Sequence, residues 1–210
     1  MVKYKALLID FDNTIIGSEN ANHLLFVRNM ENMIGRKMTR EDGYNFRGHT
    51  WKEIFKIMSE RYLPEMPPQE LREIFVRSKI DYFKDKTAPI AAGLSDILAL
   101  DIKKAIVTGS SKPEVEMFSH LLELDKFDMI VSDELYDKGK PAPDGYAYAV
   151  KKFGLEPHQC VAVEDSHIGL MSANAAGCIT VFTREFTNED LSSAADFTVG
   201  SIAEVIKLLS

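Results

Sequence analysis

Two carboxylates one residue apart, Asp10 and Asp12, follow a short apolar segment near the amino terminus. That segment, residues 6–9, is typical of a buried strand, and open α/β sheets bind their ligands at the carboxyl ends of such strands. Two neighbouring acids repel each other unless a cation or a shared proton lies between them. The pair therefore indicates a site for a cation or for proton transfer, although an Asp-x-Asp sequence alone is more often a polar exit from a strand.

Polar residues also follow three later segments that are typical of strands. In chain order they are Thr108, Gly109, Ser110, Lys140, Glu164 and Asp165. Because parallel strands end at one edge of a sheet, we expect these residues beside the first acid pair. The combined set offers a nucleophile, a proton shuttle, hydroxyl and amide donors, a fixed cation and a pair of metal-binding acids. Phosphoryl transfer through a covalent aspartyl phosphate requires these groups.

The apolar pattern predicts the elements that position this set. Strands are expected over residues 4–10, 104–108, 129–132, 160–163, 179–182 and 197–199. Helices are expected over residues 112–122, 143–153 and 166–176, with a last one ending at residue 209. Strands that alternate with single helices predict right-handed crossovers and an α/β fold, a doubly wound parallel sheet covered on both faces.

Residues 15–87 differ in character from the rest of the chain. They contain helical apolar spacing over 20–33, a stronger stripe that begins at Trp51, and a helix opened by Pro67 and Pro68, but no convincing strand. Gly43 and Gly48 are expected to break this segment. The sequence thus predicts a core domain made of residues 1–14 and 88–210, with a small all-helical cap domain, residues 15–87, inserted after the first strand.

The composition excludes several classes of partner. The chain has 210 residues, with 25 Lys and Arg against 32 Asp and Glu, which gives a net charge of −7. We therefore expect no nucleic-acid partner, because a phosphate backbone requires a basic face. Without a long apolar run we expect no membrane span and a cytoplasmic location. A monomer or weak homodimer is also expected. Cys160 and Cys178 are expected to be small buried side chains.

Four motifs in order make the chain resemble the haloacid dehalogenase-like (HAD) superfamily. The motifs are Asp10-Phe11-Asp12-Asn13-Thr14, Ile106-Val107-Thr108-Gly109-Ser110, Gly139-Lys140-Pro141-Ala142-Pro143-Asp144 and Val163-Glu164-Asp165-Ser166-His167-Ile168-Gly169. The resemblance covers essentially the whole chain. It is strongest to the branch of phosphatases and β-phosphoglucomutases that carry a helical cap after the first motif.

The resemblance implies a role for each core residue. Asp10 would attack phosphorus, and Asp12 would protonate the leaving group and then activate water. Thr108, Gly109, Ser110 and Lys140 would hold the phosphoryl oxygens. Mg²⁺ would be bound by Asp10, by the backbone carbonyl of Asp12 and by Asp165, with Glu164 either binding it directly or supporting the other ligands.

The resemblance also draws attention to residues of the cap. Arg47, Gly48, His49 and Trp51 resemble a loop that reads the substrate, and Lys79 lies near the position of a phosphate-binding lysine in mutases. For each side chain a plainer interpretation stays open. Trp51 would pack within the cap, and the charged or histidine side chains would be solvated.

The expected function is a Mg²⁺-dependent phosphomonoester hydrolase acting on a small phosphorylated metabolite, of the sugar phosphate or phosphoglycolate type. The alternative is a β-phosphoglucomutase-like hexose phosphomutase, which shares the core chemistry. In the resemblance, Asp12 favours phosphate esters over dehalogenation, because a departing halide needs no proton. A receiver-type signalling domain fits poorly, because its acceptor aspartate lies on a middle strand and no large helical insert is expected. A binding scaffold without activity also fits poorly, because every chemical position is filled.

Overall fold

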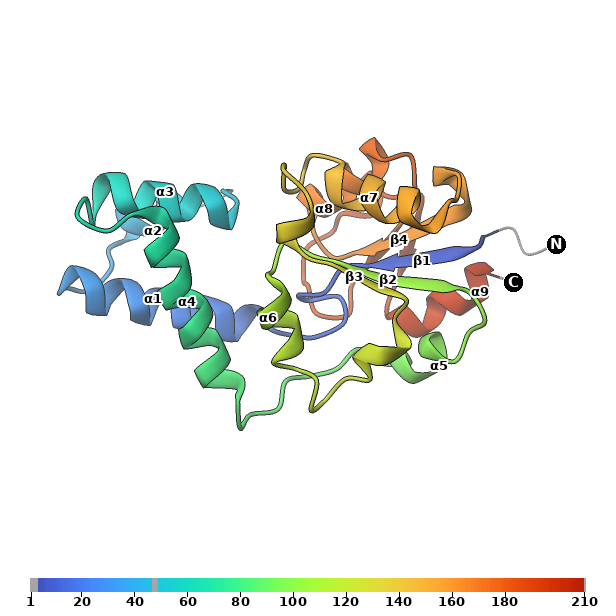
Figure 1. Ribbon diagram of the computed structural model, residues 1–210, viewed down its shortest axis with the longest axis horizontal. Coiled ribbons are helices and arrows are strands. Elements are labelled where there is room, and N and C mark those ends of the chain that lie inside the picture. Colours follow the sequence, from blue (N-terminus) through green and yellow to red (C-terminus); the bar gives the residue numbers. More distant parts are fainter. Residues whose placement is uncertain (1–3, 47–48, 210) are drawn as a thin grey trace. The chain divides into compact units, whose positions relative to one another are not determined.

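The computed structural model describes residues 4–46 and 49–209 (Figure 1). Its contacts divide the chain into two compact units. The sheet unit comprises Met1–Ser18 and Thr87–Ser210, and the helical unit comprises Glu19–Lys86. Ile15 and Ile16 are fully buried, and Ile16 forms a β-bridge with Ile90, so this turn after the first strand belongs to the sheet unit by its contacts.

The sheet unit is built on six parallel strands in the order β3-β2-β1-β4-β5-β6. The strands are β1 (Ala6–Ile9), β2 (Lys103–Val107), β3 (Met129–Val131), β4 (Cys160–Glu164), β5 (Ile179–Thr183) and β6 (Phe197–Val199). Each was expected from the sequence, and the predicted α/β class is confirmed. The chain order reverses between β1 and β4, which makes that junction the topological switch point of the sheet.

Helices cover both faces of this sheet (Figure 1). Figure 1 shows α7 (Asp144–Phe153) and α8 (His167–Ala175) on one face, with α5 (Leu94–Leu98) and α9 (Val205–Leu209) on the other. All four residues of β1 are buried, because the central strand is covered from both sides. The predicted cap of α8 is confirmed, since Ser166 Oγ accepts a hydrogen bond from the Gly169 amide at 3.1 Å.

One helical prediction in the sheet unit was wrong, and one helix was not predicted. The helix expected over 112–122 ends early, because α6 covers only Lys112–Glu116 and turns follow it. The short helix α5 was not expected. It begins after Gly93, whose φ of +78° is the left-handed conformation that glycine adopts without strain.

The helical unit contains α1 (Glu19–Ile34), α2 (Arg40–Phe46), α3 (Trp51–Arg61) and α4 (Pro68–Phe83). The predicted break at Gly43 is wrong, because α2 runs through that residue. The Thr39 amide donates to Asp42 Oδ2 at 2.7 Å, which holds the first turn of α2. Phe26, Phe55 and Phe75 form the aromatic centre of this unit. Among the described residues, no helix is long and apolar enough to cross a membrane.

Candidate active site

The strand order brings Asp10 and Glu164 together. The register pairs Ile9 with Val163 on neighbouring strands, and the Asp10 amide donates to the Val163 carbonyl at 3.0 Å. Asp10 therefore leaves β1 beside Glu164, the last residue of β4, at the switch point of the sheet. Asp10 is 7% exposed and Glu164 is fully buried. Ligands bind at this position in open α/β sheets.

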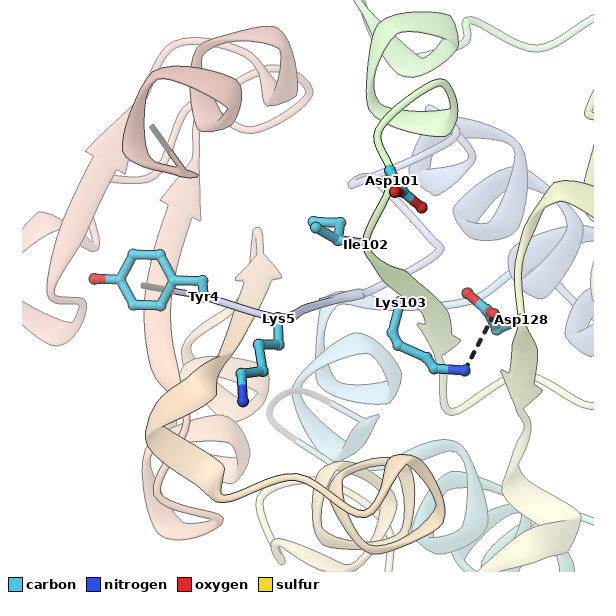
Figure 2. A pocket seen from close by; sticks show the side chains of 6 residues that line it. All are labelled: Tyr4, Lys5, Asp101, Ile102, Lys103 and Asp128. Atoms are coloured by element: carbon cyan, nitrogen blue, oxygen red, sulfur yellow. Dashed lines mark ion pairs between the residues drawn. The ribbon is translucent and has the colours of Figure 1, made fainter. Parts of the chain in front are cut away.

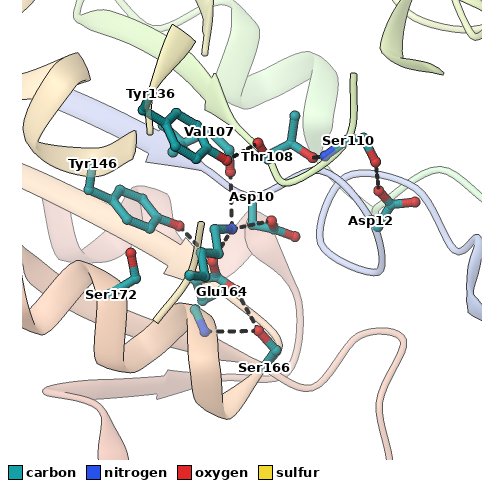
Figure 3. Close-up of polar contacts among 12 residues, drawn as sticks. Asp10, Asp12, Val107, Thr108, Ser110, Tyr136, Tyr146, Glu164, Ser166 and Ser172 are labelled. Carbon is teal, nitrogen blue, oxygen red and sulfur yellow. Dashed lines mark hydrogen bonds and ion pairs between the residues drawn. The ribbon is translucent and has the colours of Figure 1, made fainter. Parts of the chain in front are cut away.

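Lys140 joins Asp10 and Glu164, both of which are labelled in Figure 3. Its Nζ lies 2.5 Å from Asp10 Oδ1, contacts Glu164 Oε1, and donates to the Val107 carbonyl at 3.1 Å. Burial alone would lower the pKa of the Lys140 ammonium, but the two neighbouring carboxylates raise it above its ordinary value. Lys140 is therefore a permanent positive charge placed at the carboxyl ends of β1, β2 and β4.

Asp165 completes a group of three acids with Asp10 and Glu164, in which one carboxylate oxygen from each residue lies within 4.8 Å of the other two. Burial first, and Glu164 second, raise the pKa of Asp10 to about 7 against the opposing effect of Lys140. Burial, then Asp10 and Glu164, raise the pKa of Asp165 to about 9. When all are ionised, three acids with one lysine carry excess negative charge, and all the ligand atoms that the acids offer are oxygens. The group could therefore hold a divalent cation of the Mg²⁺ type.

Asp12 lies apart from that cluster and is held by two hydroxyl groups. Ser18 Oγ donates to Asp12 Oδ1. Ser110 Oγ donates to Asp12 Oδ2 at 2.7 Å (Figure 3). The turn between Asp12 and Ser18 contains Asn13 with φ of +60°, a conformation that asparagine tolerates, and Asn13 Oδ1 accepts from the Ser18 amide. Both oxygens of Asp12 are thus oriented by neutral donors, a suitable setting for a group that exchanges a proton.

Thr108, Gly109 and Ser110 form the turn that follows β2. The Ser110 amide donates to Thr108 Oγ1 at 3.0 Å, and Tyr136 Oη donates to the Thr108 carbonyl at 2.7 Å. A Cβ added at Gly109 would meet nothing within 4 Å. The hydrogen bond from Tyr136 therefore holds this turn in place. The backbone at Gly109 has open space beside it, so another group could approach it there.

The predicted cap residues all belong to the helical unit or lie outside the described residues. Arg47 and Gly48 lie outside them. The Trp51 ring packs on Phe26, Phe55 and Phe75, although 43% of the residue is exposed. His49 Nδ1 lies 3.7 Å from Glu53, and Lys79 is buried in α4. Their roles toward a substrate stay predictions.

Four hydroxyl groups that contact the predicted residues were not expected from the sequence. They belong to Ser18, Tyr136, Tyr146 and Ser166, the last of which was expected only as a helix cap. The apolar spacing of residues 143–153 places Tyr146 on the inner face of its helix, but spacing does not show what a buried phenol contacts. No motif marks Ser18 at all.

The described residues also form a hollow at the opposite edge of the sheet (Figure 2). It measures about 390 Å³ and is lined by Tyr4, Lys5, Asp101, Ile102, Lys103 and Asp128. It contains two lysines and two aspartates, and Lys103 lies 3.7 Å from Asp128. Open α/β sheets bind their ligands at the carboxyl ends of the strands, so the candidate site is the carboxyl edge.

Comparison with known proteins is consistent with this geometry. The family described as haloacid dehalogenase-like hydrolase matches residues 7–183. Hexitol phosphatase A of Escherichia coli (strain K12) is 30% identical over 112 residues, which cover 53% of this chain but only 52% of that protein. Fructose-1-phosphate phosphatase YqaB of the same strain is 27% identical over 187 residues, covering 87% and 97%.

Among solved structures, CbbY from Rhodobacter sphaeroides in complex with phosphate superimposes with a TM-score of 0.83. It is 23% identical, and the match covers 98% of this chain and 96% of that one. At 23% identity, the structural similarity to CbbY supports only a shared fold. The family match supports membership of this chain in the family.

Proposed function

The chain belongs to the haloacid dehalogenase-like hydrolase family, and from that premise we propose that it hydrolyses phosphate monoesters of small metabolites, of the sugar phosphate or phosphoglycolate type. The carrying observation is the placement of Asp10 between a fixed lysine and two further acids, with Asp12 held nearby on two hydroxyls. Sugar phosphates are suggested by the names of the relatives, which include a hexitol phosphatase and a fructose-1-phosphate phosphatase.

In this proposal a carboxylate oxygen of Asp10 attacks phosphorus, and the bond from phosphorus to the ester oxygen breaks. Asp12 gives its proton to the departing alkoxide, which leaves an aspartyl phosphate on Asp10. Asp12 then takes a proton from a water molecule whose oxygen attacks the same phosphorus. The bond from phosphorus to the Asp10 oxygen breaks, inorganic phosphate leaves, and both carboxyl groups return to their starting states.

The remaining core residues stabilise the transferred group. Lys140 and the Thr108 hydroxyl, with the amides of Gly109 and Ser110, offer donors to the phosphoryl oxygens. Asp10, the Asp12 carbonyl and Asp165 would hold Mg²⁺, with Glu164 beside them. When bound, such a cation neutralises charge on the phosphoryl group and the nucleophile.

The test is phosphate release from a panel of sugar phosphates and phosphoglycolate with Mg²⁺ present. We expect turnover of one or a few esters, and its loss in Asp10→Asn and Asp12→Asn, both of which preserve side-chain size. An active Asp10→Asn variant would refute the nucleophile. Interconversion of hexose 1- and 6-phosphates after priming with a bisphosphate, without release of phosphate, would replace the hydrolase by the mutase.

A further inference from the structure

Tyr146 is the fully buried phenol behind this site. It lies on α7, and its ring is completely removed from solvent. Its Oη donates to Glu164 Oε1 at 2.7 Å, and its ring centroid lies 5.3 Å from Lys140 Nζ (Figure 3). Tyr146 therefore contacts both members of the ion pair that joins β4 to Lys140.

Glu164 is held by protein donors on both of its oxygens. Oε1 accepts from Lys140 and Tyr146, and Oε2 accepts from Ser166 Oγ at 3.1 Å. A Cβ at Gly169 would lie 2.0 Å from this carboxyl group, so the start of α8 leaves room for the carboxylate and nothing more. A buried carboxylate requires such donors, because an unpaired one carries a large desolvation cost.

We propose that Tyr146 is a positioning residue that sets how Lys140 is shared between Glu164 and Asp10. The inference rests on the proposed function, in which Asp10 is the nucleophile. With the phenol in place, Glu164 has a second donor on Oε1, and the ammonium lies 2.5 Å from both Glu164 Oε1 and Asp10 Oδ1. Without the phenol, Lys140 is the remaining donor to Oε1 among the described residues, so its hydrogen bonding shifts toward Glu164 and its bond to Asp10 weakens.

The same phenol withdraws negative charge from the three-acid group. A carboxylate that loses a hydrogen-bond donor presents a more negative potential to its surroundings. Removal of the Tyr146 hydroxyl should therefore strengthen cation binding at Asp10, Glu164 and Asp165, while the misplaced lysine slows the reaction. A general loss of structure would weaken both, so the opposite signs identify the positioning role.

The experiment compares Tyr146→Phe with the wild type and with Tyr148→Phe. Tyr148 lies on the same helix, and its ring faces Lys152 at 5.3 Å. For Tyr146→Phe we expect kcat to fall about tenfold with KM within about twofold, because small displacements of catalytic groups have effects of this size. By titration calorimetry without substrate, Mg²⁺ should bind about threefold or more tightly. Tyr148→Phe should change neither quantity.

A double-variant test identifies the route. Because Tyr146 acts through Glu164, Tyr146→Phe combined with Glu164→Gln should have the kcat of Glu164→Gln alone. Multiplicative losses, an unchanged kcat in Tyr146→Phe, or weaker Mg²⁺ binding would overturn the proposal. If the wild type releases no phosphate, the proposed function fails, whereas the calorimetric comparison still tests the effect of Tyr146 on the acid group.

Discussion

Substitution of Gly169 by alanine tests the geometry of the site most directly. The added Cβ would lie 2.0 Å from Cδ and Oε2 of Glu164 and 2.1 Å from Oε1, whereas ordinary contacts begin near 3.4 Å. The separation must therefore grow by about 1.4 Å, although Glu164 is fully buried and bonded on both oxygens. Either α8 moves away from β4, or the Glu164 carboxylate loses hydrogen bonds from its donors.

Both responses have a known range of cost. Overpacking a close-packed site costs about 1–3 kcal/mol, and breaking a buried ion pair costs about 3–5 kcal/mol. We expect Gly169→Ala to lose about 3 kcal/mol of unfolding free energy. In a chain of this length that corresponds to a fall in Tm of about 6–12 °C. Because Lys140 and Asp10 depend on the same carboxylate, phosphate release should fall by about 100-fold.

The assay is thermal unfolding followed by circular dichroism, with phosphate release measured on the same preparations. The control is Gly43→Ala in α2, where an added Cβ meets nothing within 4 Å and the glycine has no positive φ. That change should raise stability by about 0.5–1 kcal/mol, because alanine loses less conformational entropy than glycine in a helix. The two alanine substitutions should therefore have opposite effects on Tm.

A Gly169→Ala variant that melts within 2 °C of wild type and retains its activity would refute this reasoning. A second variant makes the test specific to Glu164. Shortening that side chain in Gly169→Ala/Glu164→Ala removes the clash, so the double variant should be more stable than the sum of the single losses by at least about 1 kcal/mol. Strict additivity would show that the cost arises elsewhere.

Three other predictions concern the acids. Ser18→Ala removes a donor from Asp12 and should lower kcat about three- to tenfold with little change in Tm; an unchanged kcat would count against the oriented proton shuttle. The pKa values of Asp10 and Asp165, raised to about 7 and about 9, favour protonated acids in the metal-free fold, so their contribution to stability falls as the pH rises through those values. The gain in Tm on adding Mg²⁺ should therefore be larger at pH 8 than at pH 6, and a constant gain would contradict the cation site. Asp42→Asn, which weakens a bidentate arginine pair in the helical unit, should lower stability by about 1–2 kcal/mol, measured by denaturant unfolding at pH 7; no loss would show that the pair contributes nothing.

Most of the sheet unit could be predicted because its strands are short and mostly apolar. The central strand β1 is buried on both faces, so its sequence carries no polar residue until the chain reaches the edge at Asp10. Elements with weaker patterns were missed. The helix α2 contains a glycine and several polar residues, and α5 has only five residues, too few to show a helical period.

Only those residues of the candidate site that lie at or near the ends of strands could be predicted. The rule that parallel strands end together placed Asp10, Lys140 and Glu164 at one edge, and the structure joins them through hydrogen bonds. The same rule does not predict Ser18 and Tyr146, because their hydroxyls contact the acids from a turn and from a helix that covers the sheet. Such contacts depend on how elements pack across the fold, and the spacing of residues within one element does not contain that information.

The charges of the site explain how an acidic protein can bind an anion. Asp10, Glu164 and Asp165 face a single lysine, so the group carries two negative charges in excess when all three acids are ionised. The raised pKa values of Asp10 and Asp165 show that this excess is unfavourable in a buried place. A divalent cation would neutralise it, and Lys140 with the amides after β2 would then face the phosphoryl group without opposing charge. In the proposed function, the local charge balance at one sheet edge, rather than the net charge of −7, therefore decides which ligand the site accepts.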